Sequence, residues 1–468
     1  MGSSQYQWLD ANFTSEDQHD KRVAALCEQM QEFDLNARNR SHDGKLPYHS
    51  PSDVPGLNKI IAMDVLTFTT RVECNMTMEA LVQTTLAFGF LPSVVAGSRS
   101  ATVSDAFAAM TSESSSFAFG TFDSTVTEIE VILGDGRLVC ARPDDPITAD
   151  LFYGSAGGLN SLGLITLLEV CLVRAGPYVE LNLQPVTEAS SSGIAFAEPR
   201  PHSGGSAIPP LDATEMCRSD AISAMEEVIR TQGNDFVEAM MFRMSSGVVI
   251  AGRFSPKASH PIVHKSQEYL RLVTDVWRTQ RHLVRCMSTV SYLFRNMDYL
   301  AMQHSGDATS ASHLPSIGGP AMSTVTMRRK SYGVPRSRIN AFLQAVESRP
   351  IVIRRIMQPK DVGRRQSLGA AFPFEYEIDC CISGGSGHDA IEEWLLRKSH
   401  PGGFSYLQCR APCQPGAAWV LHNDRWHVEP WLFHDDRWYV ELRSRWKSEA
   451  MADISERVTC LNPLRFTG

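Results

Sequence analysis

The segment at residues 126–141 constrains the fold most strongly. It consists of two apolar runs, VTEIEVIL and RLVCA, on either side of a Gly-Asp-Gly turn. Gly136 can take the positive φ that a tight turn requires, so the segment predicts a β-hairpin. The stretch ADLFYGSAGGLNSLGLITLLEVCLV (149–173) then predicts a short helix, a Gly-rich turn and a buried strand. This part of the chain is therefore expected to build a sheet.

The remaining pattern predicts a mixed α and β protein. Helices are expected at 20–33, where Val23, Leu26, Cys27, Met30 and Phe33 share one face, and at 77–91, starting at Thr77. Residues 262–304 are expected to be mostly helical. Short strands are expected at 56–66, 69–76 and 374–382, and paired strands at 235–242 and 247–254. The Ser/Pro/Gly-rich run at 190–210 predicts a loop or linker and suggests a domain boundary near 178–210.

Composition excludes several classes of protein. The 468 residues are enough for two or three domains, and 43% hydrophobic with 21% charged residues is typical of a globular protein. The net charge of −8, with no Lys/Arg-rich run, argues against a nucleic-acid partner. We expect no signal peptide, no transmembrane segment and a cytoplasmic location. The 11 cysteines lack zinc spacing, so reduced thiols and no metal site are expected.

Common catalytic and nucleotide-binding motifs are missing. The sequence contains no GxGxxG fingerprint, P-loop, HExxH or GxSxG. Two other Gly- or Ser-bearing segments remain as candidates for a cofactor site, namely SATVSDAFAAMTSESSSFAFGTF (100–122) and GSAGGLNSLGLIT (154–166). We expect residues 100–166 to form a layer of strands and loops.

These two segments carry a family resemblance. Residues 101–186 resemble the flavin domain of Δ24-sterol reductases, which belong to the vanillyl-alcohol-oxidase superfamily with its PCMH-type FAD fold. Weaker matches follow at 234–242, 291–303 and 375–387. The matching landmarks are Thr102-Val103, Glu113-Ser114-Ser115-Ser116, Gly120, Phe122, Gly134-Asp135-Gly136, Asp150-Leu151-Phe152-Tyr153 and Leu162-Gly163.

The resemblance implies a fold class, a domain organisation and a cofactor. The implied fold is α+β, with a two-subdomain PCMH-type flavin-binding fold at 1–180 and an α/β substrate or cap domain at 181–420. An aromatic-rich C-terminal segment at 421–468 is expected to pack on the core. The implied cofactor is non-covalent FAD, bound by Thr102, Val103, Ser104, Ser114, Ser115, Gly120, Gly157, Gly158, Gly163 and Ile165.

The sequence departs from the family in both phosphate-binding loops. Ser104 and Asp105 stand where the family has two glycines, and glycine lets backbone amides approach a pyrophosphate closely. A carboxylate about 5 Å from a phosphate charge costs ~3 kcal/mol at an effective dielectric near 20. The counterpart of the family's first loop, at 35–45, has its only glycine late, at Gly44, although Arg38 and Arg40 could supply charge. FAD binding and loss of FAD therefore both stay open.

Two functional hypotheses follow. The first is an FAD-linked oxidoreductase acting on a C–C bond of an apolar terpenoid- or polyketide-like molecule in specialised metabolism. The second is a cofactor-free cyclase or pericyclase of the Diels-Alderase type that keeps the flavoprotein fold. A non-catalytic scaffold is a third class. Tyr153, Tyr292 and Arg295 are the candidate catalytic residues; the last two are three apart on a predicted helix and so share a face. The substrate and the oligomeric state stay open.

Overall fold

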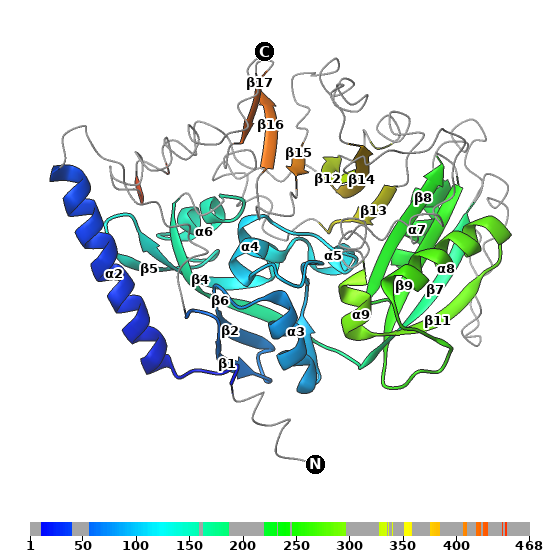
Figure 1. The fold of residues 1–468 in the computed structure, drawn as a ribbon, viewed down its shortest axis with the longest axis horizontal. Coiled ribbons are helices and arrows are strands. Elements are labelled where there is room, and N and C mark those ends of the chain that lie inside the picture. Colours follow the sequence, from blue (N-terminus) through cyan, green and yellow to red (C-terminus); the bar gives the residue numbers. More distant parts are fainter. Residues whose placement is uncertain are drawn as a thin grey trace.

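The described residues build two β-sheets. The computed structural model describes residues 11–39, 56–158, 162–186, 220–231, 233–243, 246–295, 327–334, 336, 339, 351–357, 375–383, 406–409, 418–422, 425–428, 442 and 445–446. The predicted linker at 190–210 lies outside them. The chain passes from a six-stranded sheet to an eleven-stranded sheet between Arg174 and Tyr178 (Figure 1). Mixed helix and strand content agrees with an α+β protein, and the division into domains at residue 180 stays a prediction.

The first sheet is antiparallel and centred on the longest strand. Its order is β1 (Ile60–Asp64), β2 (Thr69–Glu73), β6 (Gly163–Arg174), β4 (Val126–Leu133) and β5 (Leu138–Ala141), and β3 (Phe90–Pro92) also pairs with β6. The predicted hairpin is confirmed, because β4 pairs with β5 and the turn glycine has a φ of +81°. The strands expected around β1 and β2 are also confirmed.

One long helix and several short ones lie around this sheet. They are α2 (Glu16–Asn39), α3 (Met78–Ala87), α4 (Val103–Ala108), α5 (Ser116–Phe119), the 3-10 helix η2 (Phe122–Thr125) and α6 (Ala149–Ser155). The predicted start of α3 is confirmed, since the Thr77 hydroxyl accepts a hydrogen bond from the Ala80 amide at 3.3 Å. Its predicted end at 91 is wrong, because the helix stops at Ala87 and β3 pairs with β6. The short helix predicted at the start of 149–173 is confirmed as α6. The expectation that 100–166 otherwise forms a layer of strands and loops is wrong, because α4, α5 and η2 also lie there. The Thr102–Asp105 capping box stabilises α4, and all three helices are too short to show a period in the sequence.

The second sheet carries the rest of the described strands. Its order is β10 (Ile262–Val263), β11 (Leu283–Ser288), β7 (Tyr178–Val186), β9 (Ser246–Ser255), β8 (Phe236–Arg243), β13 (Ile351–Arg355), β14 (Tyr376–Ser383), β12 (Met327–Val334), β15 (Tyr406–Cys409), β16 (Ala418–His422) and β17 (Arg425–Val428). The predicted pairing of β8 with β9 and the strand at β14 are confirmed. The mostly helical prediction for 262–304 is wrong at β11, because pairing with β7 overrides local propensity.

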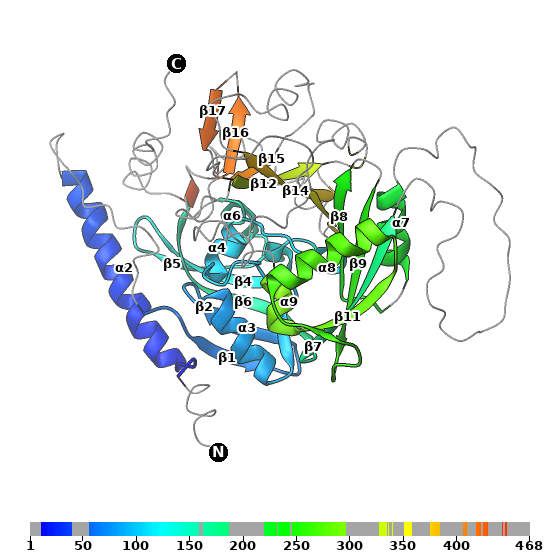
Figure 2. The ribbon, with the colours of Figure 1, turned by 45° about the vertical axis from the view of Figure 1, so that its right-hand side comes forward.

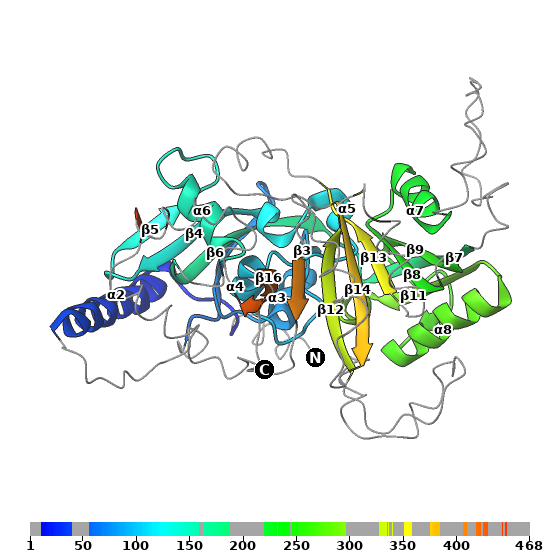
Figure 3. The same ribbon diagram turned by 90° about the horizontal axis from the view of Figure 1, so that it is seen from above.

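Helices cover both faces of the second sheet. In β8, Val237 and Met241 belong to the same core as α7 (Asp220–Arg230), whereas Phe236 and Phe242 pack with α8 (Ser266–Thr279). Figure 3 shows these two helices on opposite sides of β7, β8 and β9. The short helix α9 (Thr289–Leu293) lies between the first sheet and β9 (Figure 2). Burial on both faces explains why β8 is a nearly continuous apolar run.

Part of the C-terminal segment contacts the first sheet's helices. Leu442 and Trp446 are buried in the larger core. The Trp446 indole donates a hydrogen bond to Asp150 of α6 at 3.1 Å, and Arg445 forms an ion pair with the same carboxylate at 2.7 Å. These described positions of the C-terminal region thus pack on α6.

We expect Gly136→Ala to lower the free energy of unfolding by about 1–3 kcal/mol, because an alanine would hold a strained positive φ. Its Cβ would also meet α2, 2.7 Å from the Cys27 carbonyl oxygen. Gly89→Ala is the matched control, since Gly89 has a φ of +82° and open space around it. Urea denaturation should show a larger loss for Gly136→Ala. Equal losses would contradict the close packing of α2 on the hairpin.

Candidate functional site

Charged side chains from the second sheet face the first sheet. Side chains alternate along a strand, so residues at paired positions of neighbouring strands share a face. The face that carries α8 also bears four charged side chains: Glu238 of β8, Arg354 of β13, and Glu377 and Asp379 of β14. Opposite them lies the loop between α4 and α5. This loop is held on the second sheet by a hydrogen bond from the Val237 amide to the Ser114 carbonyl oxygen at 2.8 Å.

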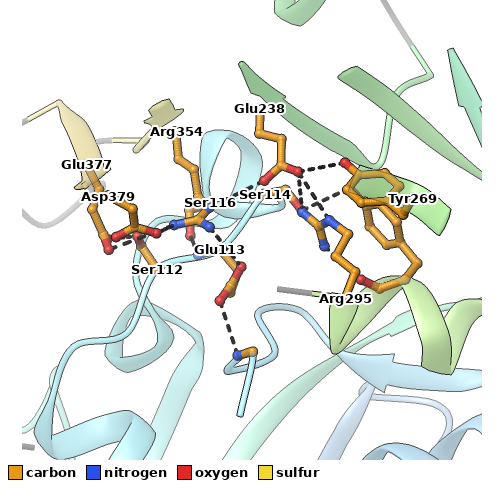
Figure 4. Close-up of polar contacts among 12 residues, drawn as sticks. Ser112, Glu113, Ser114, Ser116, Glu238, Tyr269, Arg295, Arg354, Glu377 and Asp379 are labelled. Carbon is orange, nitrogen blue, oxygen red and sulfur yellow. Dashed lines mark hydrogen bonds and ion pairs between the residues drawn. The ribbon is translucent and has the colours of Figure 1, made fainter. Parts of the chain in front are cut away.

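Arg354 is the centre of this buried cluster (Figure 4). Its Nη1 lies 2.6 Å from Asp379 Oδ2, and its Nη2 and Nε lie 3.6 Å from Glu113 Oε2 and Glu238 Oε2. The Ser112 hydroxyl donates to Glu377. Glu113, from the loop, also accepts the Gly97 amide at 3.1 Å. The fully buried guanidinium thus ties strands of the second sheet to a loop of the first.

Arg295 forms a second buried ion pair with the same cluster. Its Nη2 and Nε donate to Glu238 Oε1 at 2.5 and 3.2 Å, and the Tyr269 hydroxyl donates to that oxygen at 3.2 Å. Burial would raise the pKa of Glu238, but the charges of Arg295 and Arg354 outweigh it and lower that pKa. The guanidinium also stacks on the Tyr292 ring at 4.0 Å. Arg295 is therefore held rigidly by charge and by stacking.

A cavity of about 140 Å³ lies beside these residues, between the two sheets. Ser114, Ser115 and Arg295, all predicted site residues, line it. The Ser114 and Tyr292 hydroxyls are 3.2 Å apart, and burial raises the pKa of Tyr292 to about 12. The other lining residues are Leu91, Pro92, Ser93, Val95, Glu113, Phe119, Val173, Asp235, Phe236, Phe254 and Leu293.

Tyr153 is not brought together with Tyr292 and Arg295. It lies on α6, packs edge-on against Phe152, and its hydroxyl donates to the Pro143 carbonyl oxygen at 3.4 Å. It belongs to the core of the first sheet and does not line the cavity. Its catalytic role stays a prediction that the geometry does not favour.

The remaining predicted FAD residues lie on several elements of the first sheet. Thr102, Val103 and Ser104 start α4, and Gly120 ends α5 with a φ of +78°. Gly157 follows α6 with a φ of +71°, and the Gly158 amide donates to the Ser155 carbonyl oxygen at 3.1 Å. Gly163 and Ile165 are in β6, opposite Leu133 and Val131 of β4. None of these residues lines the cavity.

The start of α4 does not fit a pyrophosphate in this conformation. Thr102 and Asp105 form a capping box, in which the Thr102 amide donates to Asp105 Oδ2 at 3.0 Å and the Asp105 amide donates to Thr102 Oγ1 at 3.1 Å. The amides of Val103, Ser104 and Ala106 donate to backbone carbonyl oxygens at 3.0–3.1 Å. All five consecutive amides are therefore already used within the protein, and Asp105 supplies the anion at this helix start.

No role is predicted from the sequence for the residues of the charged cluster. Glu113 was only a landmark, and Glu238, Arg354, Glu377 and Asp379 were not singled out. The available signal was a charged residue inside an apolar strand, as in FVEAMMF, IVIRR and YEIDCCI. Such a residue is costly to bury unless it is paired, so it indicates a buried ion pair or a site.

Among the described residues, no three His, Cys, Asp or Glu side chains are grouped so that they could hold a metal ion. No helix in the described ranges is both long enough and apolar enough to cross a membrane.

Comparison with known proteins gives distant similarities. No protein-family model matches the chain. The chain is 26% identical over 276 residues to a Delta(24)-sterol reductase of Pisum sativum, covering 55% of this chain and 44% of that protein. It is also 26% identical over 221 residues to a Delta(24)-sterol reductase of Arabidopsis thaliana, covering 47% and 35%.

A third similarity is to a different kind of enzyme. Over 154 residues the chain is 26% identical to a decaprenylphosphoryl-beta-D-ribose oxidase of Mycolicibacterium smegmatis, covering 33% of this chain and 32% of that protein. The chain spans less than half the length of each of these three relatives. The chain is thus distantly similar to reductases and an oxidase, in line with the FAD-binding oxidoreductase superfamily that its sequence resembles.

Proposed function

We propose that the chain is an oxidoreductase-like enzyme that acts on a C–C bond of a small apolar molecule bound in the cavity between the two sheets. Similarity to sterol reductases and an oxidase supports the class of reaction. The observation that carries the proposal is the cavity itself, where an apolar wall meets Ser114, Arg295 and Glu113. Ligand sites are commonly apolar clefts with a few fixed polar groups.

The chain's own residues can orient a substrate and handle a proton in this cavity. Tyr292 is protonated at neutral pH, as a tyrosine is at its ordinary pKa, and burial raises that pKa further, to about 12. Its hydroxyl can therefore donate to Ser114. The Ser114 hydrogen is then free to point into the cavity and polarise an oxygen of the substrate. Arg295 stacks on the Tyr292 ring and fixes its orientation. Ser114 is the group that touches the substrate, and Tyr292 and Arg295 position it.

FAD is the cofactor that the similarities to oxidoreductases suggest. The start of α4 does not fit its pyrophosphate, because the five amides at 102–106 are paired within the protein. FAD binding therefore requires either a rearranged start of α4 or a phosphate site elsewhere. We derive no step of the reaction through this cofactor.

The paired amides favour a second candidate, a cofactor-free cyclase or pericyclase on the same fold. Such an enzyme needs an apolar cavity and a hydrogen-bond donor rather than a redox centre. The cavity and the Ser114–Tyr292 pair meet both requirements. The two candidates differ in one measurable property, the binding of FAD.

We expect a titration of the purified protein with FAD, followed by flavin fluorescence, to separate the candidates. For an FAD enzyme, Ser104→Gly with Asp105→Gly should tighten binding by up to roughly a hundredfold, since a carboxylate beside the phosphates is removed. Loss of the capping box should also cost about 1 kcal/mol of stability. If neither protein binds FAD, the oxidoreductase assignment is wrong and the cofactor-free candidate is supported. Tight binding without a gain in the double variant would show that Asp105 does not face the phosphates.

Thr14→Gly is a matched control for the titration. It also replaces a hydroxyl side chain near a helix start, at the N-terminus of α2, where Thr14 contacts Gln18 and Arg22. This substitution should leave FAD affinity unchanged. A similar change in both variants would point to a general loss of structure rather than to the phosphate segment.

A further inference from the structure

The wall of the cavity combines aromatic rings with carboxylates. Three phenylalanines, Phe119, Phe236 and Phe254, line it together with Glu113 and Asp235. The rings of Phe236 and Phe254 are held edge to face with centroids 5.1 Å apart. The face of an aromatic ring carries partial negative charge and attracts cations. The aromatic rings and the carboxylates of this wall therefore both favour a positively charged ligand.

Arg295 is the one cationic side chain among the lining residues, and each of its three nitrogens already donates a hydrogen bond within the protein. Its Nε and Nη2 donate to Glu238, and its Nη1 donates to the Tyr292 carbonyl oxygen at 2.8 Å. The ion pair with Glu238 offsets the charge of Arg295. The guanidinium therefore offers no uncompensated charge to an anion, and the remaining charged groups of the wall are carboxylates.

The two carboxylates keep hydrogen-bonding capacity. Glu113 accepts the Gly97 amide and lies 3.6 Å from Arg354. Asp235 accepts the Phe254 amide at 2.7 Å, and burial raises its pKa, as expected for a carboxylate that its neighbours do not fully compensate. A carboxylate can accept about four hydrogen bonds. Both side chains can therefore accept further donors from a ligand.

We propose that this cavity binds a compact organic cation, an ammonium group with apolar substituents. This proposal deepens the proposed function by adding one charged group, an ammonium at the buried end, to an otherwise apolar substrate, and it rests on that function only for the identity of the cavity as the substrate site. The volume of about 140 Å³ is close to the ~150 Å³ cavity that takes a benzene molecule. The buried part of the ligand therefore has roughly six to eight non-hydrogen atoms.

Choline and 3,3-dimethylbutan-1-ol provide the test. The two molecules have the same shape and differ in a positively charged nitrogen against a neutral carbon. We expect calorimetric titration of the full chain to show choline binding about tenfold more tightly or better, as a desolvated cation over aromatic rings requires. Equal affinity, a preference for the neutral alcohol, or no binding of either probe would overturn the proposal.

Two cavity variants and one control complete the experiment. Glu113→Gln and Asp235→Asn each keep an acceptor for the existing amide but remove a charge, so each should reduce the preference for choline by about threefold or more. Asp235 is only partly buried, which makes its variant informative even if Glu113→Gln fails to fold. Glu180→Gln removes a half-exposed carboxylate of β7, paired with Ser259 and His260, and should change nothing. If a folded Asp235→Asn variant kept the full preference for choline over 3,3-dimethylbutan-1-ol, the proposal would be contradicted.

The outcome is separable from that of the proposed function. The FAD titration reports on the cofactor and on the start of α4, which shares no residue with the cavity lining. If choline shows no preference while FAD binds, the substrate class is wrong and the oxidoreductase assignment stands. If choline binds selectively while FAD does not, the cavity proposal stands without a redox role.

Discussion

Arg354→Leu should lower the free energy of unfolding by about 3–5 kcal/mol, the typical cost of leaving a buried partner charge unpaired. Arg354 is fully buried, with Asp379, Glu113 and Glu238 around its guanidinium. Leucine fills part of the volume but leaves these carboxylates without their cation. Urea denaturation monitored by circular dichroism measures the change.

A control and a partial rescue sharpen this prediction. Arg230→Leu removes an arginine that is two-thirds exposed and paired with Glu227, so it should cost less than about 1 kcal/mol. Adding Asp379→Asn to Arg354→Leu should recover part of the loss, because one uncompensated charge is removed. A loss below about 1 kcal/mol for Arg354→Leu would show that the cluster does not hold the two sheets together.

His19 should make stability depend on pH above neutrality. It is buried on α2 between Glu73 of β2 at 2.9 Å and Glu130 of β4 at 3.1 Å. Burial alone would lower the pKa of His19, but hydrogen bonds and charges from Glu130 and Glu73 outweigh it and raise the pKa to about 9. The unfolded pKa is about 6.5. Protonated His19 therefore stabilises the fold fully below pH ~6.5, and this contribution is lost as the pH rises through about 9.

The expected size of this effect is about 3 kcal/mol, from the pKa difference of about 2.5. Free energies of unfolding measured from pH 6 to pH 10 should fall more steeply for the wild type than for His19→Gln. His282→Gln is the control, since His282 is exposed and bonds only to Asn182 among the described residues. Parallel profiles for the wild type and His19→Gln would mean that His19 is not protonated between the two carboxylates.

Local sequence patterns were sufficient to predict the elements that are fixed by interactions between residues close together in the chain. The hairpin of β4 and β5 follows from a glycine turn between apolar runs, and the start of α3 follows from a capping threonine. The apolar runs of β8 and β9 pair as expected. In each case the information lies within about twenty consecutive residues, because turn geometry and capping are local interactions.

Non-local pairing decided the elements that sequence reasoning missed. β11 forms because its residues pair with β7, about 100 positions earlier in the chain. Local secondary-structure propensity carries no information about a pairing at that distance. The start of α4 has the composition of a phosphate loop, yet its amides bond to Cys74, Met76 and its own capping box. A resemblance between sequences therefore did not show whether those donors are free.

The sequence by itself determined β1, β2, β4, β5, β8, β9 and β14, the main turn and the likeness to flavin-dependent oxidoreductases. Only the tertiary structure decided what surrounds the candidate site. It placed Tyr292 and Arg295 beside Ser114 and left Tyr153 in a separate core. It also brought Glu113 to Arg354, 241 positions later in the chain. The physical reason is that a charge inside an apolar strand is tolerated only with partners that long-range packing supplies, and neither period nor spacing encodes those partners.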